Sequence, residues 1–404
     1  MKSIRSFTTL FLALVSLLAD WTYAEPIKFA VIGDYGKGAR TRKVDALIAK
    51  WTPDFVITLG DNSYSPDKNE NHQPQNSFVV DVLPSFGTYI DEGRFFPSLG
   101  NHDYSSPGSG HVPERVQRYF KTLRPPLNGP GAGRYYEFAQ GSVRFFALNS
   151  NRYEPDKRVF YREQGDWLRD RLRAATEPFK VVFFHHPPYT TSSRGPVRDL
   201  RWPFKEWGAS LVLSGHEHSY ERFDRRGLAY VVNGLGGNHH AEQPLPSGGT
   251  IEGVTKHKAY PTELTPSSDR KFGAMLVKAD DDQMELTMFT VRLVDQTVEG
   301  VQRDTFTIAA NAPAPAPIYR DLSVELVHEK AADVTAWQDF LFERNFLGSN
   351  IGQAVDGRFG AGTREGTERF QEQQHLTVTG VLDTATRDHA RTLNFKPLEN
   401  PNPN

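Results

Sequence analysis

Carboxylate, phenol, amide and imidazole side chains recur in this sequence directly after short apolar runs. Taken singly they are weak signals, because Gly-Asp after a strand usually marks only a turn. Together they form one set of candidate ligands: Asp34, Asp61, Tyr64, Asn101, His185, His216 and His218. In "GHEH" the two histidines are two residues apart, so both point to one face of an extended backbone. Oxygen and imidazole donors without sulfur suit iron, manganese or zinc, so the pattern predicts a metal site.

The apolar runs before these residues must place them at one edge of a sheet. Residues 27–36 and 54–62 have the β-branched and aromatic composition of buried strands, and residues 39–51 between them have helical spacing. Strand, helix and strand with short connections predict a sheet covered by helices. Further strands are expected at 143–149, 180–186, 209–218 and 228–234, with an antiparallel pair at 273–280 and 283–290. In such open sheets the site lies at the carboxyl ends of the strands.

Composition limits the other classes of function. The chain has 404 residues, 24% charged and 38% hydrophobic, which is ordinary for a globular protein of two or more domains. A net charge of -2 favours neither nucleic acid nor an anionic membrane as partner, and we find no nucleic-acid-binding module. The absence of cysteine excludes disulfides, thiolate metal ligands and a cysteine nucleophile.

The N-terminus has the pattern of a signal peptide. Lys2 and Arg5 precede the apolar run 11–19, and Ala24 provides a small residue at a cleavage point. A membrane anchor is the alternative, but the run is well short of the roughly 20 residues that span a bilayer. We therefore expect residues 1–24 to be removed on export, with no membrane span afterwards.

The alternating Ala-Pro stretch at 312–317 predicts a stiff linker. We expect one domain at 25–310, the linker at 311–324, a small helical domain at 325–395 and a tail at 396–404.

The ordered motifs "GDYG", "GDNSY", "GNHD", "VFFH" and "GHEHSYER" resemble those of the calcineurin-like metallophosphoesterases, and within them the purple acid phosphatases. The tartrate-resistant acid phosphatase type is the most similar, because the motifs begin directly after the signal with no preceding sandwich domain. The resemblance covers roughly residues 27–310. It implies an α/β (α+β) fold of two stacked mixed β-sheets flanked by helices.

The resemblance to this subfamily depends on the residues at two positions. Most members of the superfamily open with Gly-Asp-x-His, whose histidine binds the first metal, but here that position is Gly36. In purple acid phosphatases a tyrosine in Gly-Asp-x-x-Tyr replaces it, and Tyr64 stands at that position. Tyr35 is expected to be a packing aromatic.

The resemblance assigns a role to each candidate ligand. Asp61 would bridge two metals. The first, ferric site would be completed by Asp34, Tyr64 and His218. The second site, for Fe(II), Zn(II) or Mn(II), would be completed by Asn101, His185 and His216. Metal-bound hydroxide would attack the phosphate in line, and His102 would stabilise the transition state or protonate the leaving alkoxide.

Two loops depart from the family pattern or leave roles open. Related enzymes often have a histidine shortly after the Val-x-x-His motif, whereas residues 187–198 contain none, so the residue that protonates the leaving group is in doubt. Arg194 is interpreted as a solvated loop arginine, with a phosphate contact as the alternative. His186 is interpreted as adjacent to the site, and His239 and His240 as possible pocket residues.

The C-terminal segment resembles the peptidoglycan-binding domain of bacterial wall enzymes, a compact three-helix module. The matching residues are Val334, Trp337, Gln338, 356–360, 369–376 and 379–386. The resemblance implies peptidoglycan as a partner, with tethering at the wall.

The sequence thus predicts an exported bacterial acid phosphatase, periplasmic, wall-associated or secreted, that hydrolyses phosphomonoesters. One alternative is a phosphodiesterase or nucleotide hydrolase on the same site. Another is a wall-binding protein with a degenerate phosphatase domain, which is weakened because no core ligand position is missing.

Overall fold

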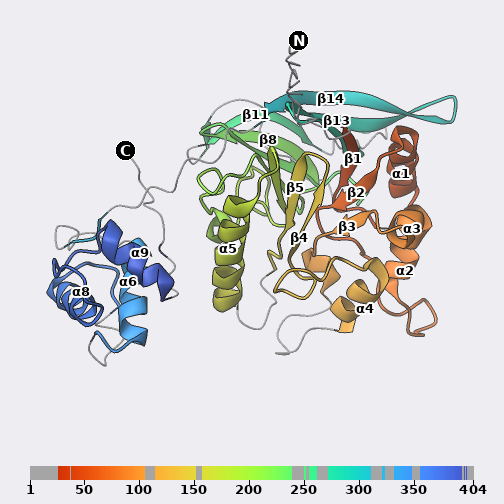
Figure 1. Ribbon diagram of the computed structural model, residues 1–404. Helices are drawn as coiled ribbons and strands as arrows, with labels where there is room; N and C mark the ends of the chain where they lie inside the picture. The colour runs from red at the N-terminus through yellow and green to blue at the C-terminus, as the bar shows by residue number, and fades with distance from the viewer. Residues whose placement is uncertain are drawn as a thin grey trace, which may run out of the picture. The chain divides into compact units, whose positions relative to one another are not determined.

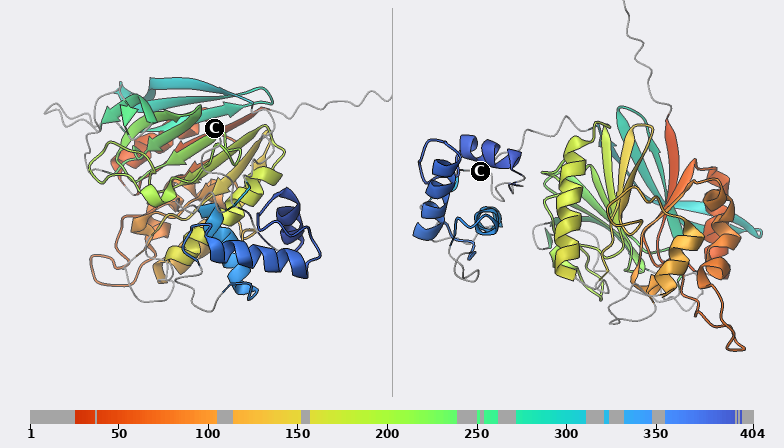
Figure 2. Two further views of the ribbon diagram at one scale, coloured as in Figure 1. Left: turned by 90° about the vertical axis from the view of Figure 1, so that its left-hand side faces the viewer. Right: turned by 60° about the horizontal axis from the view of Figure 1, so that its bottom comes forward.

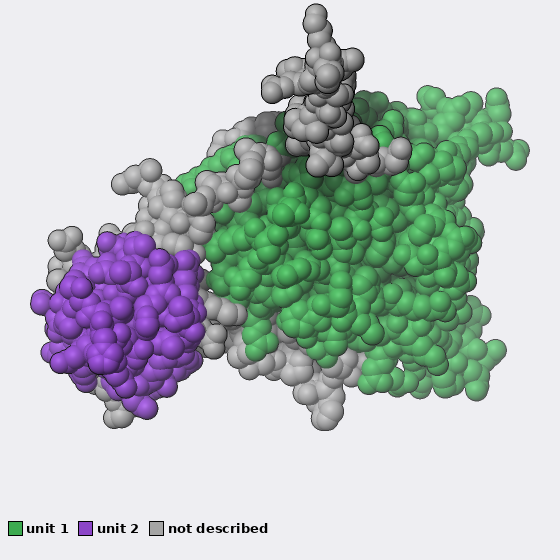
Figure 3. Space-filling model, viewed as in Figure 1, with its two compact units in different colours: residues 1–313 green, residues 314–404 purple. Residues whose placement is uncertain are grey.

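The protein divides into two compact units, residues 1–313 and residues 314–404 (Figure 3). The computed structural model describes residues 26–36, 38–104, 114–151, 157–238, 250–251, 254–261, 272–310, 321–323, 332–347, 355–393, 395 and 397. The predicted signal peptide and most of the predicted linker and tail lie outside these residues. Among the described helices, none is long and apolar enough to cross a membrane.

The first unit contains two mixed sheets (Figure 1). One has six strands in the order β14-β13-β12-β1-β2-β3, parallel from β1 to β3 and antiparallel elsewhere. Its strands are β1 (Ile27–Ile32), β2 (Phe55–Thr58), β3 (Phe95–Pro97), β12 (Gly273–Ala279), β13 (Gln283–Val294) and β14 (Thr297–Ala309).

The other sheet has eight strands in the order β10-β11-β8-β9-β7-β6-β5-β4. Its strands are β4 (Tyr136–Gln140), β5 (Val143–Ala147), β6 (Phe179–Phe184), β7 (Leu211–Ser214), β8 (Ser219–Arg225), β9 (Leu228–Asn233), β10 (Thr250–Ile251) and β11 (Val254–Pro261). The strands β5, β6, β7 and β9 run parallel, so their carboxyl ends lie at one edge.

Helices cover the outer face of each sheet (Figures 1 and 2). The helices α1 (Ala39–Trp51), α2 (Ser77–Asp81), α3 (Leu83–Asp91) and α4 (Glu114–Leu123) accompany the first sheet, and α5 (Lys157–Ala174) accompanies the second. Two 3₁₀ turns, η1 (Asn101–Asp103) and η2 (Arg198–Leu200), lie in loops.

Strand β1 shows why the predicted runs are almost wholly apolar. Phe29 and Val31 enter the core between the sheets, whereas Ala30 and Ile32 pack with residues of the covering helices. A strand buried on both faces carries no polar alternation. The predicted architecture of two mixed sheets flanked by helices is confirmed, and so is the helix at 39–51.

The second unit has its own hydrophobic core. Its described helices are α6 (Ala332–Glu343), α8 (Ala361–Gln373) and α9 (Thr384–Thr392). Trp337, Phe340 and Phe370 pack with Phe359 and Phe395 in that core. The indole of Trp337 stacks on Phe340 with ring centroids 5.1 Å apart. Each of these aromatic side chains therefore has a packing role.

Two buried glutamines organise the turns of this unit in the same way. The amide of Gln338 donates to Asp356 Oδ1, Arg358 O and Thr363 Oγ1 and accepts from Gly357 N. Gln371 donates to Thr379 Oγ1, Val381 O and Thr386 Oγ1 and accepts from Thr379 N and Gly380 N. Each glutamine thus joins one helix to the turn that precedes the next helix.

Candidate metal centre

The turns at the ends of β1 and β2 bring two carboxylates into the first unit's interior. Asp34 and Asp61 follow these strands with φ of 58° and 51°, a left-handed conformation that turns the chain sharply. Both carboxylates are fully buried. Gly60, at φ 83°, lies against His185, since a Cβ there would come within 2.6 Å of Nδ1. Only glycine lets the β2 turn approach this histidine.

One half of the candidate centre surrounds the phenol oxygen of Tyr64. This oxygen lies 3.0 Å from Asp61 Oδ2, 3.2 Å from Asp34 Oδ1 and 3.4 Å from His218 Nε2. His218 Nε2 is in turn 3.4 Å from Asp34 Oδ1. Two carboxylates, a phenol and an imidazole therefore converge on one point.

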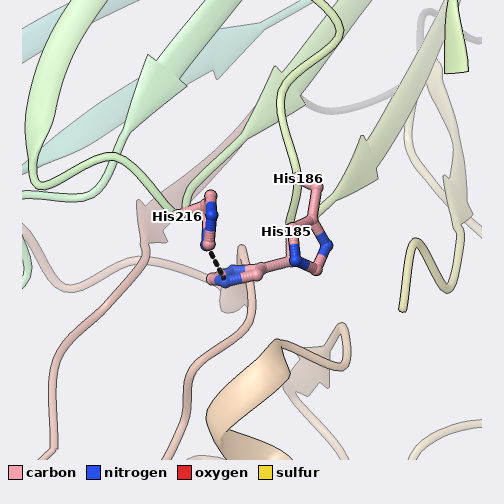
Figure 4. A group of neighbouring side chains, drawn as sticks. All are labelled: His185, His186 and His216. Atoms are coloured by element: carbon pink, nitrogen blue, oxygen red, sulfur yellow. Dashed lines mark hydrogen bonds between the residues drawn. The ribbon is translucent and has the colours of Figure 1, made fainter. Parts of the chain in front are cut away.

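The other half surrounds His185. Its Nε2 lies 2.9 Å from Asn101 Oδ1, 3.3 Å from Asp61 Oδ1 and 3.1 Å from His216 Nδ1. Figure 4 shows the close approach of the His185 and His216 rings. The two oxygens of Asp61 thus face different halves, Oδ2 towards Tyr64 and Oδ1 towards His185.

The chemistry of these donors fits a bound cation. His185 Nδ1 lies 2.8 Å from the carbonyl oxygen of Leu59, which only accepts, so Nδ1 carries a proton and Nε2 is the atom of this ring that can bind a cation. Nε2 faces an amide oxygen and a carboxylate oxygen, so it must carry either a proton or a metal cation to join these acceptors. Two groups, His185–His186–His216 and Asp34–Asp61–His185, place possible ligand atoms within 4.8 Å of one another.

The pKa values of His185, Asp61 and Tyr64 are shifted by burial and by the charges of the neighbouring groups. Burial lowers the pKa of His185, but the Asp61 and Asp34 carboxylates and the hydrogen bonds to Asp61 and Leu59 O together outweigh it and raise the pKa to about 9, so the ring is protonated when no metal is bound. Burial would raise the pKa of Asp61, yet the His185 charge holds it below its usual range. Burial, followed by Asp61 and Asp34, raises the pKa of the Tyr64 phenol well above 10. A metal cation at this point would reverse the effect on the phenol.

Buried charged residues hold the ligand-bearing loops together. Asp81 Oδ2 accepts from Ser63 Oγ at 2.8 Å and from Tyr64 N at 3.0 Å, while Arg115 donates to Ser63 O and to His102 O, both at 2.9 Å. Sequence reasoning missed both, because the partners are separated by 13 to 52 residues and no local motif connects them.

Asp103 is a further supporting carboxylate. It accepts from Gly100 N at 2.8 Å, from Asn62 N at 3.0 Å and from Asn62 Nδ2 at 2.8 Å. It therefore joins the "GDNSY" loop to the "GNHD" loop. Its position directly after His102 was a signal that could have identified it.

The contrast between Gly36 and Tyr64 has a spatial counterpart. Gly36 has φ 83°, and a Cβ at this position would lie 3.0 Å from Tyr64 Cδ2. The tyrosine ring thus fills the space that a side chain at position 36 would enter. Tyr35, by contrast, is buried with its hydroxyl donating to Asn62 Oδ1 at 2.8 Å, as a packing role predicts.

Two histidines outside the predicted ligand set, His102 and His186, lie close to the candidate centre. The side chain of His102 is 48% exposed, its ring centroid is 4.5 Å from that of Tyr64, and its backbone N donates to Asp61 Oδ1 at 2.8 Å. His186 is buried, with Nδ1 2.9 Å from Ser150 Oγ and its ring 4.5 Å from that of His216. His239 and His240 lie outside the described residues.

Comparison with known proteins defines the class. Residues 27–220 match the calcineurin-like phosphoesterase family, and residues 330–389 match a peptidoglycan binding domain family. The chain therefore carries a calcineurin-like metallophosphoesterase domain followed by a segment of the second family.

The individual relatives are purple and tartrate-resistant acid phosphatases. "Probable purple acid phosphatase 20" of Arabidopsis thaliana is 28% identical over 275 residues, which cover 61% of this chain and 58% of that protein. "Tartrate-resistant acid phosphatase type 5" of Rattus norvegicus is 24% identical over 265 residues, covering 55% and 76%. The chain is thus homologous to enzymes of this kind, but it spans little more than half the length of the plant relative.

A solved structure supports the fold. The purple acid phosphatase from yellow lupin (Lupinus luteus) seeds superposes with a TM-score of 0.53 at 18% sequence identity, over 74% of this chain and 57% of that chain. The two mixed sheets flanked by helices are thus a fold that the chain shares with that structure.

Proposed function

We propose that the first unit is an acid phosphatase that hydrolyses phosphomonoesters with the help of two metal ions. The ligands are the side chains that converge at the strand ends: Asp34, Asp61, Tyr64, Asn101, His185, His216 and His218. The observation that carries the proposal is the division of Asp61, whose two oxygens face separate groups of donors at 3.0 Å and 3.3 Å. A carboxylate in this position can bridge two ions.

The two halves suit different ions. Asp34, Tyr64 and His218 offer a carboxylate, a phenol that can ionise and one imidazole, which favours Fe(III). Asn101, His185 and His216 are neutral ligands, which favours Fe(II), Zn(II) or Mn(II). When bound, such a pair binds and neutralises the phosphate and lowers the pKa of water so that a nucleophile is available in acid.

The chain's own residues orient the substrate and move a proton. Asp61 holds the two halves in register, and its own position is set by the His102 backbone N–H. The half-exposed His102 ring lies beside Tyr64, at the solvent side of the donors. There it would donate a hydrogen bond to the phosphoryl group or a proton to the leaving oxygen.

Export and wall association extend the proposal. The N-terminal pattern at residues 1–24 supports secretion, and the match at 330–389 supports peptidoglycan as a partner. Tethering would raise the concentration of the enzyme at the wall.

The test compares para-nitrophenyl phosphate with bis(para-nitrophenyl) phosphate at acid pH, together with metal analysis of the purified protein. We expect hydrolysis of the monoester to exceed that of the diester and to be lost on chelation. Faster hydrolysis of the diester would assign a phosphodiesterase instead. Activity that survives both chelation and Asp61→Asn would overturn the metal mechanism.

A further inference from the structure

The loop that follows His185 and His186 is a built structure rather than a loose connection. The carboxylate of Glu221 on β8 is fully buried and accepts from Thr190 Oγ1 at 2.5 Å, from Thr191 N at 3.1 Å and from Thr191 Oγ1. Ser192 Oγ lies 3.1 Å from Ser219 Oγ on the same strand. These contacts anchor the first half of the loop against β8.

Arg194 extends from this anchored segment to the candidate metal centre. The chain turns at Gly195, whose N donates to Ser192 O at 3.2 Å and whose φ is 78°. The guanidinium Nη1 of Arg194 donates to the carbonyl oxygen of His216 at 2.7 Å. The side chain is also exposed to solvent, so a fixed positive charge stands at the accessible side of the donors.

His216 is one of the proposed ligands, and its Nδ1 lies 3.1 Å from His185 Nε2. The contact of Arg194 with the carbonyl oxygen of His216 therefore ties the guanidinium to the backbone of the second half of the centre.

The charge of Arg194 is suited to binding an anion and not to proton transfer. A guanidinium does not lose its proton in proteins, and its planar fork matches phosphate oxygens. The scissile phosphate would lie at the buried donors, whereas Arg194 is exposed and tied to the backbone of His216. A second phosphate, farther out along the substrate, would therefore come within reach of this side chain.

We propose that Arg194 determines specificity by binding a second phosphate of the substrate, so that the enzyme favours substrates whose leaving group carries a phosphate of its own, such as the phosphoanhydride of a nucleoside diphosphate. This inference rests on the proposed phosphatase function. In hydrolysis of adenosine diphosphate, the bond between the β-phosphorus and the bridging oxygen breaks and water forms the new P–O bond. The products are inorganic phosphate and adenosine monophosphate, whose phosphate would be held by Arg194.

The experiment measures kcat/KM for adenosine diphosphate and adenosine monophosphate with the full chain and its Arg194→Gln and Arg194→Lys variants. Arg198→Gln, at an exposed arginine on the same loop, is the matched control. We expect Arg194→Gln to lower the diphosphate-to-monophosphate ratio about tenfold, mainly through KM, as loss of a charge-assisted contact predicts. Arg194→Lys should retain part of the ratio and Arg198→Gln all of it.

The outcomes separate this inference from the function on which it rests. An unchanged ratio in Arg194→Gln, or an equal loss for both nucleotides, overturns the role of Arg194 while the phosphatase function stands. A ratio that falls equally in Arg198→Gln also overturns it, because the effect then belongs to the general charge of the loop. A wild-type protein inactive on both nucleotides and on para-nitrophenyl phosphate overturns the phosphatase function itself.

Discussion

Buried polar side chains occur in both units of the protein, but their surroundings differ. In the second unit, Gln371 pairs every donor and acceptor of its amide with a complementary partner. In the first unit, His185 Nε2 faces Asn101 Oδ1 and Asp61 Oδ1, two acceptors that must share one proton or one cation at this nitrogen. Both regions are buried, yet only one of them is complete as it stands.

The difference separates a structural polar network from a site for chemistry. A buried polar group is stable when it is fully hydrogen-bonded, so the glutamines need nothing beyond the chain. The donors of the candidate centre leave acceptors such as Asn101 Oδ1 and Asp61 Oδ1 close together, and Asp81, Asp103 and Arg115 hydrogen-bond the loops that carry them. We therefore expect the stability of the first unit to depend on a bound cation and that of the second unit not to.

Among the variants that test the contrast between the candidate centre and the second unit, Asp61→Asn is expected to change activity most. The amide keeps the shape but offers one acceptor and one donor, so it cannot serve both halves. We expect kcat/KM for para-nitrophenyl phosphate to fall about a thousandfold, roughly 4 kcal/mol of transition-state stabilisation. Asp91→Asn, at an exposed carboxylate on α3, is the control and should keep full activity. A loss below tenfold in Asp61→Asn would remove the bridging role.

The reciprocal change in the second unit is Gln371→Leu. It orphans several buried donors and acceptors at once, so we expect the free energy of unfolding of this unit to fall by about 3 kcal/mol. Phosphatase activity should stay within twofold, roughly 0.4 kcal/mol. Calorimetry and kinetics on the same preparation measure both quantities. Gln373→Leu, at an exposed position of α8, should leave both unchanged. If activity fell together with unfolding, the units would not be independent.

Metal removal should distinguish the units directly. Chelation is expected to abolish activity and to destabilise the first unit by about 3 kcal/mol, as when a ligand at a hundredfold excess over its Kd is withdrawn. The transition of the second unit should not move, because its polar groups are satisfied internally. Differential scanning calorimetry with and without chelator measures the two transitions. Equal shifts in both would contradict the comparison.

Tyr64→Phe tests the anionic half through pH. The free phenol has a raised pKa and is protonated, and the bound phenolate is not, so metal binding releases this proton and affinity falls as pH falls. His185, with its pKa raised to about 9, releases a second proton below that pH. The variant should release one proton fewer and bind metal about 10- to 100-fold more weakly at neutral pH. Isothermal titration in buffers of different ionisation enthalpy counts the protons. An unchanged count would exclude the phenol as a ligand.

The smallest effect is expected from Thr367→Val. Thr367 Oγ1 accepts from the indole N–H of Trp337 at 2.9 Å in the core of the second unit. Valine keeps the volume and leaves this donor unpaired, so the unfolding free energy should fall by about 1 kcal/mol. Thermal unfolding measures the change, with Thr392→Val at the exposed end of α9 as control. No change would show that the indole N–H finds another partner.

Much of the fold followed from local pattern. The strands at 27–36 and 54–62 and the helix at 39–51 were predictable because each is a continuous apolar run or an amphipathic repeat. The pairing of β1 with β12 on its other side was not predictable, since β12 begins at Gly273, far along the chain. Strand pairing at such separation depends on how the whole sheet packs, and local residues carry little information about it.

The sequence by itself determined the donor types, the exclusion of sulfur ligands and the contrast between Gly36 and Tyr64. These three features depend only on residue type, because the ligand atoms that a side chain offers, and the absence of a side chain at glycine, do not depend on packing. Only the tertiary structure decided that the donors face one another, that the two oxygens of Asp61 serve different halves, and that Arg194 reaches His216. Each of these distances is between loops that follow different strands. They depend on how the strands pack and on the buried charged residues between the loops.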